Sequence, residues 1–234
     1  MHIHPRSEDT NRYSSYNKIF KPADNKKVFD FGGNRGNLLF FSNNEIKESL
    51  YTCLDVSDTS IKEGQLEFPL ASWHHFDKWN WAYNHGGQFD LEFPDVDKHQ
   101  DFIWAYSVFS HTDFEEFLAT IKWFMSFKYE KIALSFLDAN EWDMKEYFRR
   151  NRIAQYGHCL DITEISSKDL FYFIDNEEVL HSALKAPKIS SNHFLAFYNP
   201  DWLLNKLNYE GINATIERPS PGYVPFLVIK NENN

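Results

Sequence analysis

The chain has 234 residues, of which 42% are hydrophobic and 18% aromatic, and its formal net charge is −10. A chain of this length can bury one sizeable core, which favours one elaborated α/β domain over two complete ones. The acidic balance, with no long cluster of Lys and Arg, argues against DNA or RNA as a partner, because a phosphate backbone is attracted by concentrated positive charge.

Cysteine content and hydropathy exclude further classes. The two cysteines, Cys53 and Cys159, lie in different segments and indicate neither a disulfide framework nor a zinc site. Residues 1–20 hold no apolar signal core, and no later run approaches the length that spans a membrane. We therefore expect a cytoplasmic protein without a membrane partner, and a homodimer is left open.

The predicted elements alternate along most of the chain. Residues 1–27 are polar and mixed, and they predict an arm or a short capping helix laid over the domain. Strand and helix patterns then alternate, which favours a mostly parallel sheet covered on both faces. Residues 139–197 interrupt the alternation and are expected to cap the carboxyl edge of the sheet as an insertion. The expected strands are 28–31, 50–56, 71–76, 101–107, 131–137 and a closing pair at 212–217 and 225–230, and the expected helices are 36–46, 57–64, 112–127, 141–150 and 200–207.

Glycines gather directly after the first expected strand. Gly32, Gly33 and Gly36 would let the backbone approach a ligand without a Cβ in the way, and Asn34 tolerates a left-handed backbone best among the other residues. Asp55 ends the next expected strand, where a carboxylate can accept hydrogen bonds from both hydroxyls of a ribose. Taken alone, the turn could be structural and the aspartate a helix cap. Together they predict a site for a nucleoside-containing cofactor.

The run DFGGNRG at residues 30–36 resembles D-x-G-x-G-x-G, the first motif of class I S-adenosylmethionine-dependent methyltransferases, with Asn34 in place of the middle glycine. It departs from the dinucleotide fingerprint G-x-G-x-x-G. Three further stretches are similar to the same family, namely LDVS at 54–57, the aromatic loop HHFDKWNWAYNHGG at 74–87, and DFIWAYSVFSHT at 101–112. HFLAFYNPDWL at 193–203 and the strands after it resemble the family's closing helix and antiparallel pair.

The resemblance covers residues 28–138 well and 193–230 loosely. It implies a Rossmann-like three-layer sandwich with a mostly parallel seven-stranded sheet and an antiparallel last strand. The methyltransferase domain would occupy residues 28–234, with 1–27 as an N-terminal arm and 139–197 as an inserted substrate cap. The implied cofactor is S-adenosyl-L-methionine.

The resemblance also assigns cofactor-binding roles. Asp30 would brace the glycine loop (residues 32–36), in which Gly32, Gly33, Asn34 and Gly36 would lie against the methionine and ribose portions, and Asp55 would hold the ribose hydroxyls. Two further pairs are implied: Phe76 and Asp77 beside the adenine, and Tyr106 and Ser107 over the methyl donor. For Asp77, a role as a turn cap is an equal alternative to the adenine contact. For Tyr106, a purely structural role in the wall of the site is an equal alternative to contact with the methyl donor.

Methyl transfer mainly requires alignment, although an oxygen or nitrogen nucleophile can need its proton removed. His111, just past the fourth expected strand, is the first candidate for a catalytic base, and a role in contacting backbone or cofactor is the alternative. His74, His75 and His85 on the aromatic loop are further candidates. No H-x-x-x-H or H-E-x-x-H spacing occurs to support a metal, so none is expected.

The acceptor is expected to be a small molecule such as a sugar, an aromatic metabolite or a biosynthetic intermediate, methylated on oxygen. A non-catalytic nucleoside-binding relative and a nicotinamide oxidoreductase are the rival interpretations. The residues expected to contact the acceptor are His75, Tyr83, His85, Asp138 and Tyr198.

Overall fold

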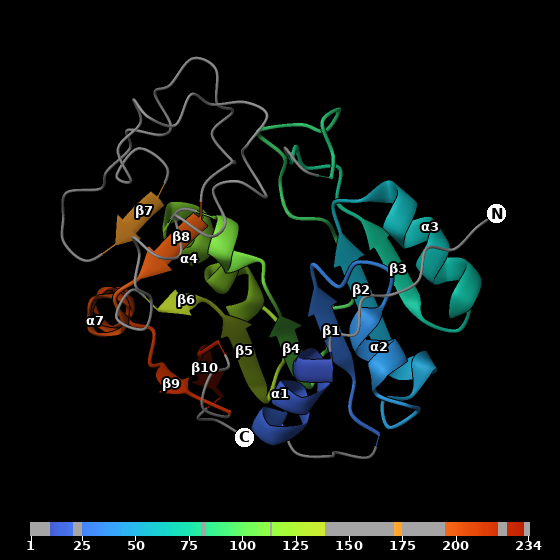
Figure 1. Ribbon diagram of the computed structural model, residues 1–234, viewed down its shortest axis with the longest axis horizontal. Helices are drawn as coiled ribbons and strands as arrows, with labels where there is room; N and C mark the ends of the chain where they lie inside the picture. Colours follow the sequence, from blue (N-terminus) through green and yellow to red (C-terminus); the bar gives the residue numbers. More distant parts are fainter. Residues whose placement is uncertain are drawn as a thin grey trace.

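The computed structural model describes residues 10–20, 25–80, 83–112, 114–138, 171–174, 195–219 and 224–231 (Figure 1). The larger elements are α1 (Thr10–Phe20), β1 (Val28–Phe31), α2 (Asn37–Phe41), β2 (Tyr51–Asp55), α3 (Asp58–Glu67), β3 (Ser72–His75), β4 (Phe102–Ala105), α4 (Phe114–Met125), β5 (Lys131–Ser135), β6 (Leu137–Asp138), β7 (Phe171–Ile174), β8 (Leu195–Tyr198), α7 (Pro200–Tyr209), β9 (Thr215–Glu217) and β10 (Phe226–Lys230). Short 3₁₀ turns are η1 (Glu48–Leu50) and η2 (Phe109–His111).

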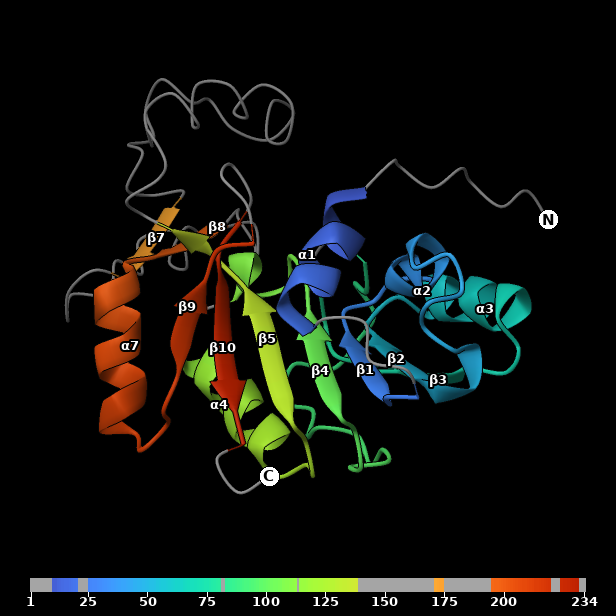
Figure 2. The ribbon, with the colours of Figure 1, turned by 90° about the horizontal axis from the view of Figure 1, so that it is seen from below.

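Seven strands form the main sheet in the order β3-β2-β1-β4-β5-β10-β9. The pairs from β3 to β5 are parallel, whereas β10 pairs antiparallel with both β5 and β9. Figure 2 shows the arrow of β10 running opposite to its neighbour β5. The expected mostly parallel seven-stranded sheet with an antiparallel strand near its end is therefore confirmed.

Helices cover both faces of the sheet, so the three-layer arrangement is also confirmed (Figures 1 and 2). Side chains alternate between the faces along a strand. Phe29 accordingly packs in one core cluster with Phe117 of α4 and Leu203 of α7. Its neighbour Val28 packs in a second cluster, with Ile19 of α1 on the opposite face.

The expected capping helix in the N-terminal segment is present as α1. Tyr16, Ile19 and Phe20, at helical spacing, are at most 6% exposed. The rings of Phe20 and Phe102 lie 4.6 Å apart, and Tyr16 meets Trp104 edge-on at 5.5 Å. Helix α1 is therefore fixed on the sheet by its carboxyl half, while its amino end lies at the edge where β4 and β5 end (Figure 2). The domain boundary at residue 28 stays a prediction.

Helix α2 is shorter than the sequence predicted, ending at Phe41 rather than near residue 46. Ser42 donates its hydroxyl to the carbonyl of Leu39 at 2.6 Å and accepts the N–H of Ile46 at 3.3 Å. Asn43 and Asn44 then adopt positive φ angles, of 49° and 70°. Local side-chain bonding and two left-handed asparagines thus end the helix early.

The strand predicted at 131–137 divides into two. β5 stays in the main sheet, whereas β6 pairs in parallel with β8 in a three-stranded sheet of order β6-β8-β7. This smaller sheet lies beyond the carboxyl end of β5 (Figure 2). The helix expected at 141–150 lies outside the described residues. Among the helices that are described, none is long and apolar enough to cross a membrane.

Candidate cofactor site

The glycine loop turns the chain from the end of β1 into α2 through three left-handed residues. Gly32, Asn34 and Gly36 have φ angles of 71°, 57° and 77°. The N–H of Gly32 donates to the carbonyl of Leu54 at 2.7 Å, which ties the loop to the end of β2. The conformation predicted from the glycines is therefore present, and Asn34 adopts it in place of a glycine.

Gly33 is required for a different reason, namely space. A Cβ at this position would lie 2.7 Å from a carboxylate oxygen of Asp30 and 2.7 Å from the sulfur of Cys53. Both groups are buried beneath the loop, so neither is the free end of a mobile side chain. The loop can approach the sheet this closely only because residue 33 has no side chain.

Asp55 connects the glycine loop to the start of α3. One carboxylate oxygen accepts the N–H of Asn34 at 2.7 Å and the other accepts the N–H of Ser57 at 2.8 Å. Burial raises the pKa of Asp55, and these two hydrogen bonds act in the opposite direction. Each carboxylate oxygen can accept more than one hydrogen bond, so the side chain, 7% exposed, retains acceptor capacity for a ligand.

Asp30 lies under the same loop and is completely buried. Burial raises its pKa to about 6, against the nearby charge of Arg12 and a hydrogen bond from Tyr51. The hydroxyl of Tyr51 donates to Oδ2 at 2.5 Å, whereas Oδ1 accepts no hydrogen bond from any described residue. Asp30 thus has unused acceptor capacity beneath the glycine loop.

The fourth strand ends in a strained turn. Ser107 is exposed and has a φ of 61°, which is uncommon for a residue with a Cβ. Its N–H donates to the hydroxyl of the buried Ser135 at 2.7 Å, which holds the turn against β5. Tyr106 stacks on Trp104 with ring centres 6.0 Å apart. Backbone strain of this kind gathers at functional sites, so the turn is a further candidate part of the site.

Phe76 and Asp77, expected beside the adenine, have structural partners. Phe76 is 3% exposed and stacks on Phe93. Asp77 accepts hydrogen bonds from the side-chain amides of Asn84 at 3.0 Å and Gln88 at 3.5 Å, which lowers its pKa. The Asp77 side chain thus helps to hold residues 77–88 together, and both the turn cap and the adenine contact stay predictions.

The two histidines that end β3 lie near the site. The Nε2–H of the exposed His75 donates to the carbonyl of Val56, one residue beyond Asp55, at 3.2 Å. His74 lies with Nε2 3.0 Å from the Ser72 hydroxyl, and burial lowers its pKa. Within the described ranges, no group of three or more His, Cys, Asp or Glu side chains is placed to hold a metal ion.

The other expected acceptor residues are spread over the carboxyl side of the fold. Tyr83 and His85 are exposed on the aromatic loop, whereas Asp138 is buried and pairs with Arg218. Tyr198 is fully buried, and its hydroxyl donates to the carbonyl of Thr112 at 2.9 Å. The backbone of His111 ends η2 beside that carbonyl, but its side chain lies outside the described residues. These assignments stay predictions.

Sequence reasoning missed Arg12 on α1. Its side chain is 9% exposed, and its guanidinium carbon lies 5.0 Å from the centre of the Tyr106 ring. Burial raises the pKa of both Asp30 and Asp55, and the positive charge of Arg12 opposes that rise. The apolar spacing of Tyr16, Ile19 and Phe20 could have predicted the helix. It could not have predicted that Arg12 lies near the carboxyl ends of the strands.

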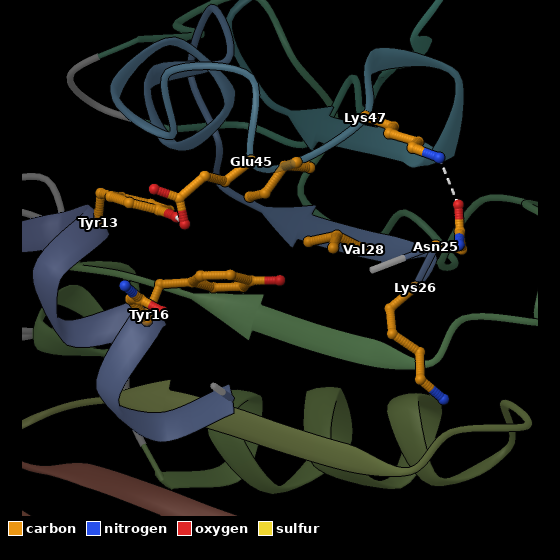
Figure 3. A pocket seen from close by; sticks show the side chains of 9 residues that line it. Tyr13, Tyr16, Asn25, Lys26, Val28, Glu45 and Lys47 are labelled. Carbon is orange, nitrogen blue, oxygen red and sulfur yellow. Dashed lines mark hydrogen bonds between the residues drawn. The ribbon is translucent and has the colours of Figure 1, made fainter. Parts of the chain in front are cut away.

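Figure 3 shows a small hollow elsewhere, between α1, the start of β1 and residues 45–47. It holds about 20 Å³, room for about one water molecule. Tyr13 donates to Glu45 at its rim at 2.5 Å, and Lys47 donates to Asn25. A second hollow, of about 340 Å³, lies near the starts of β4 and β5. Neither is lined by the glycine loop, so neither is the candidate site.

The residues at the glycine loop fit an adenosyl cofactor on three observations. The backbone is left-handed where the family motif has glycines, Gly33 lets the loop lie close against the sheet, and Asp30 and Asp55 offer acceptor capacity to ribose hydroxyls and cationic groups. In this arrangement Asp55 would hold the nucleoside of the cofactor, and the glycine loop would hold its amino-acid end.

Comparison with known proteins agrees with this geometry. Residues 29–126 match the family model of a methyltransferase domain. A search of curated proteins by sequence finds no match. The matched segment runs from β1 to the end of α4, and so contains the glycine loop, Asp55 and the turn after β4.

Solved structures share the fold at low identity. Magnesium protoporphyrin IX methyltransferase from Synechocystis PCC 6803 with bound SAH has a TM-score of 0.51 at 12% identity, over 95% of this chain and 82% of that one. The methyltransferase domain of bacterial CtHen1 has a TM-score of 0.52 at 14% identity, over 96% of this chain and 100% of that one. PKMT2 from Rickettsia typhi has a TM-score of 0.55 at 11% identity, over 100% of this chain and 55% of that one.

At these identities the structural likeness shows the fold alone. The family model covers residues 29–126, and this segment, with the strand order and the glycine loop, resembles the class I S-adenosylmethionine-dependent methyltransferases, whose cofactor is S-adenosylmethionine.

Proposed function

We propose that the chain transfers the methyl group of S-adenosylmethionine to a small-molecule acceptor, and that the acceptor atom is oxygen. The observation that carries the proposal is the hydrogen bond from the N–H of Asn34 to Asp55, which joins the glycine loop to the end of β2. Strands β1 and β2 are parallel neighbours, and their shared carboxyl edge is where parallel sheets bind ligands.

When bound, the cofactor supplies a methyl group already activated on a sulfonium sulfur. The chain therefore has to bind, align and exclude water. Asp55 would accept hydrogen bonds from the ribose, and the Asp30 carboxylate would favour a cationic group above it. The exposed turn at Ser107 would present backbone to the acceptor side.

Two features support a small acceptor. The net charge of −10 disfavours a nucleic-acid acceptor. The aromatic loop and Phe89, which follows it, present rings to solvent: Trp79 stacks on Phe89 with ring centres 4.6 Å apart, and Phe89 and Tyr83 are each 66% exposed. Rings in such a loop suit a flat or sugar-like ligand. We propose His111 as the general base, with His75 as the alternative.

The test is turnover with methyl-labelled S-adenosylmethionine and fractions of a cell metabolite extract. We expect acceptor-dependent formation of S-adenosylhomocysteine and one labelled small product, with Asp55→Ala reduced and the surface variant Asp58→Ala unchanged. Tight binding of the cofactor without turnover in any fraction would instead identify a non-catalytic relative. Selective binding of NAD(H) would overturn the methyltransferase assignment altogether.

A further inference from the structure

Helix α1 carries a buried guanidinium to the carboxyl edge of the sheet. Arg12 lies in the first turns of this helix, and its guanidinium carbon is 5.0 Å from the ring centre of Tyr106, directly after β4. The carboxyl half of α1 is fixed in the core by Ile19 and Phe20, both at most 6% exposed. The position of Arg12 at this edge is thus set by packing two turns away.

Arg12 shares this edge with two buried carboxylates. Asp30 is fully buried and Asp55 is 7% exposed, and the charge of Arg12 favours the ionised form of both. The two carboxylates come from the ends of β1 and β2 and the ring under Arg12 from the end of β4. Since β2, β1 and β4 are consecutive in the sheet, these groups surround one region.

The amino-acid end of the cofactor carries a carboxylate as well as cationic groups. The Asp30 carboxylate suits the cations, but both buried carboxylates repel the carboxylate of the cofactor, which needs a positive partner. Arg12 places a buried guanidinium at this edge, beside the Tyr106 ring, where a carboxylate of the cofactor would meet it. A guanidinium matches a carboxylate with two parallel hydrogen bonds.

We propose that Arg12 binds the carboxylate at the amino-acid end of the cofactor, so that cofactor binding fixes the amino end of α1 over the site. The inference deepens the proposed function and rests on it. It assigns to residue 12 a role in selecting ligands that carry an amino-acid end over those that carry only the nucleoside.

The test compares two ligands by isothermal titration calorimetry. S-adenosylhomocysteine has the amino-acid end, and 5′-methylthioadenosine keeps the nucleoside and the thioether but lacks it. We expect Arg12→Met to weaken S-adenosylhomocysteine binding roughly 10- to 150-fold, the range for a hydrogen bond to a charged group, and to leave 5′-methylthioadenosine nearly unchanged. Lys18→Met, which removes the same charge from an exposed position of α1, is the matched control.

Hydrogen exchange gives a second readout. Amides of residues 10–14 should be protected by S-adenosylhomocysteine but not by 5′-methylthioadenosine in the unaltered protein. Arg12→Lys, which keeps the charge and is the milder change if Arg12→Met does not fold, should lose part of the preference. An equal loss of affinity for both ligands in either variant would overturn the proposal, because it would make Arg12 merely structural. If the unaltered protein binds neither ligand, the proposed function itself fails.

Discussion

The carboxylate of Asp55 accepts the main-chain N–H of Asn34 at 2.7 Å, and so links the loop after β1 to the end of β2 across 21 positions of sequence. One side chain therefore holds the glycine loop in shape and faces the region where a ribose is expected. Loss of Asp55 should affect both roles.

For Asp55→Ala we expect the affinity for S-adenosylhomocysteine to fall by about 1–3 kcal/mol, because charge-assisted hydrogen bonds are lost. Isothermal titration calorimetry measures the change. Asp58→Ala is the control, since Asp58 is exposed and pairs with Lys62 one helical turn away. Unchanged affinity in a folded Asp55→Ala protein would show that the nucleoside binds elsewhere.

Gly33→Ala should destabilise the fold by about 1–3 kcal/mol, the usual cost of inserting a methyl group into a packed site. The added Cβ would lie 2.7 Å from both Asp30 and Cys53. Urea unfolding followed by circular dichroism gives the free energy. Gly86→Ala is matched to it, because a Cβ at Gly86 meets nothing within 4 Å. Similar unfolding midpoints for the two variants would contradict the close approach of the loop.

Asp30 should make stability depend on pH. Its pKa is about 6 in the folded protein against an ordinary value of 3.8. Because the folded protein holds this proton more tightly, Asp30 adds its full contribution to the free energy of unfolding below pH 3.8, and this contribution is lost as the pH rises through 6. The loss amounts to about 3 kcal/mol. Asp30→Asn can still accept the Tyr51 hydroxyl but does not titrate. The unfolding free energy of the unaltered protein minus that of Asp30→Asn should therefore fall between pH 4 and 7. A constant difference would refute the raised pKa.

Tyr198→Phe should loosen the turn that follows β4. The substitution removes the buried hydroxyl that donates to the Thr112 carbonyl, at a cost of about 1 kcal/mol. Hydrogen exchange of residues 109–112 should quicken, and the melting temperature should fall. Tyr209→Phe, at a side chain that is 88% exposed, should change neither. Equal exchange in the two variants would mean that the hydroxyl does not hold the turn.

The first half of the fold could be predicted because its signals are local. Val28–Phe31 is an uninterrupted buried strand closed by glycines, and the structure has the same bounds. The link between the glycine loop and Asp55 follows from the adjacency of β1 and β2, which the alternation of elements implied. A motif at the end of a buried strand was therefore enough to predict where the candidate site lies.

The remaining features depend on contacts between distant segments. Nothing near Arg12 in the sequence indicates that it reaches Tyr106, which is 94 residues away, and nothing near Tyr198 indicates that its hydroxyl meets Thr112. Ser107 likewise looks like the end of a strand, yet its bond to Ser135 accompanies a left-handed turn. Such roles come from tertiary packing, which periodicity and spacing do not encode.

The direction of β10 has a practical consequence for assays. Lys230 pairs with Lys131, the first residue of β5, whereas the glycine loop follows the last residue of β1, at the opposite end of the strands. The side chain of Lys230 is 62% exposed. A fluorophore or sensor surface coupled at position 230 would stand a full strand length away from the ligand entrance, so binding could be recorded without obstructing it.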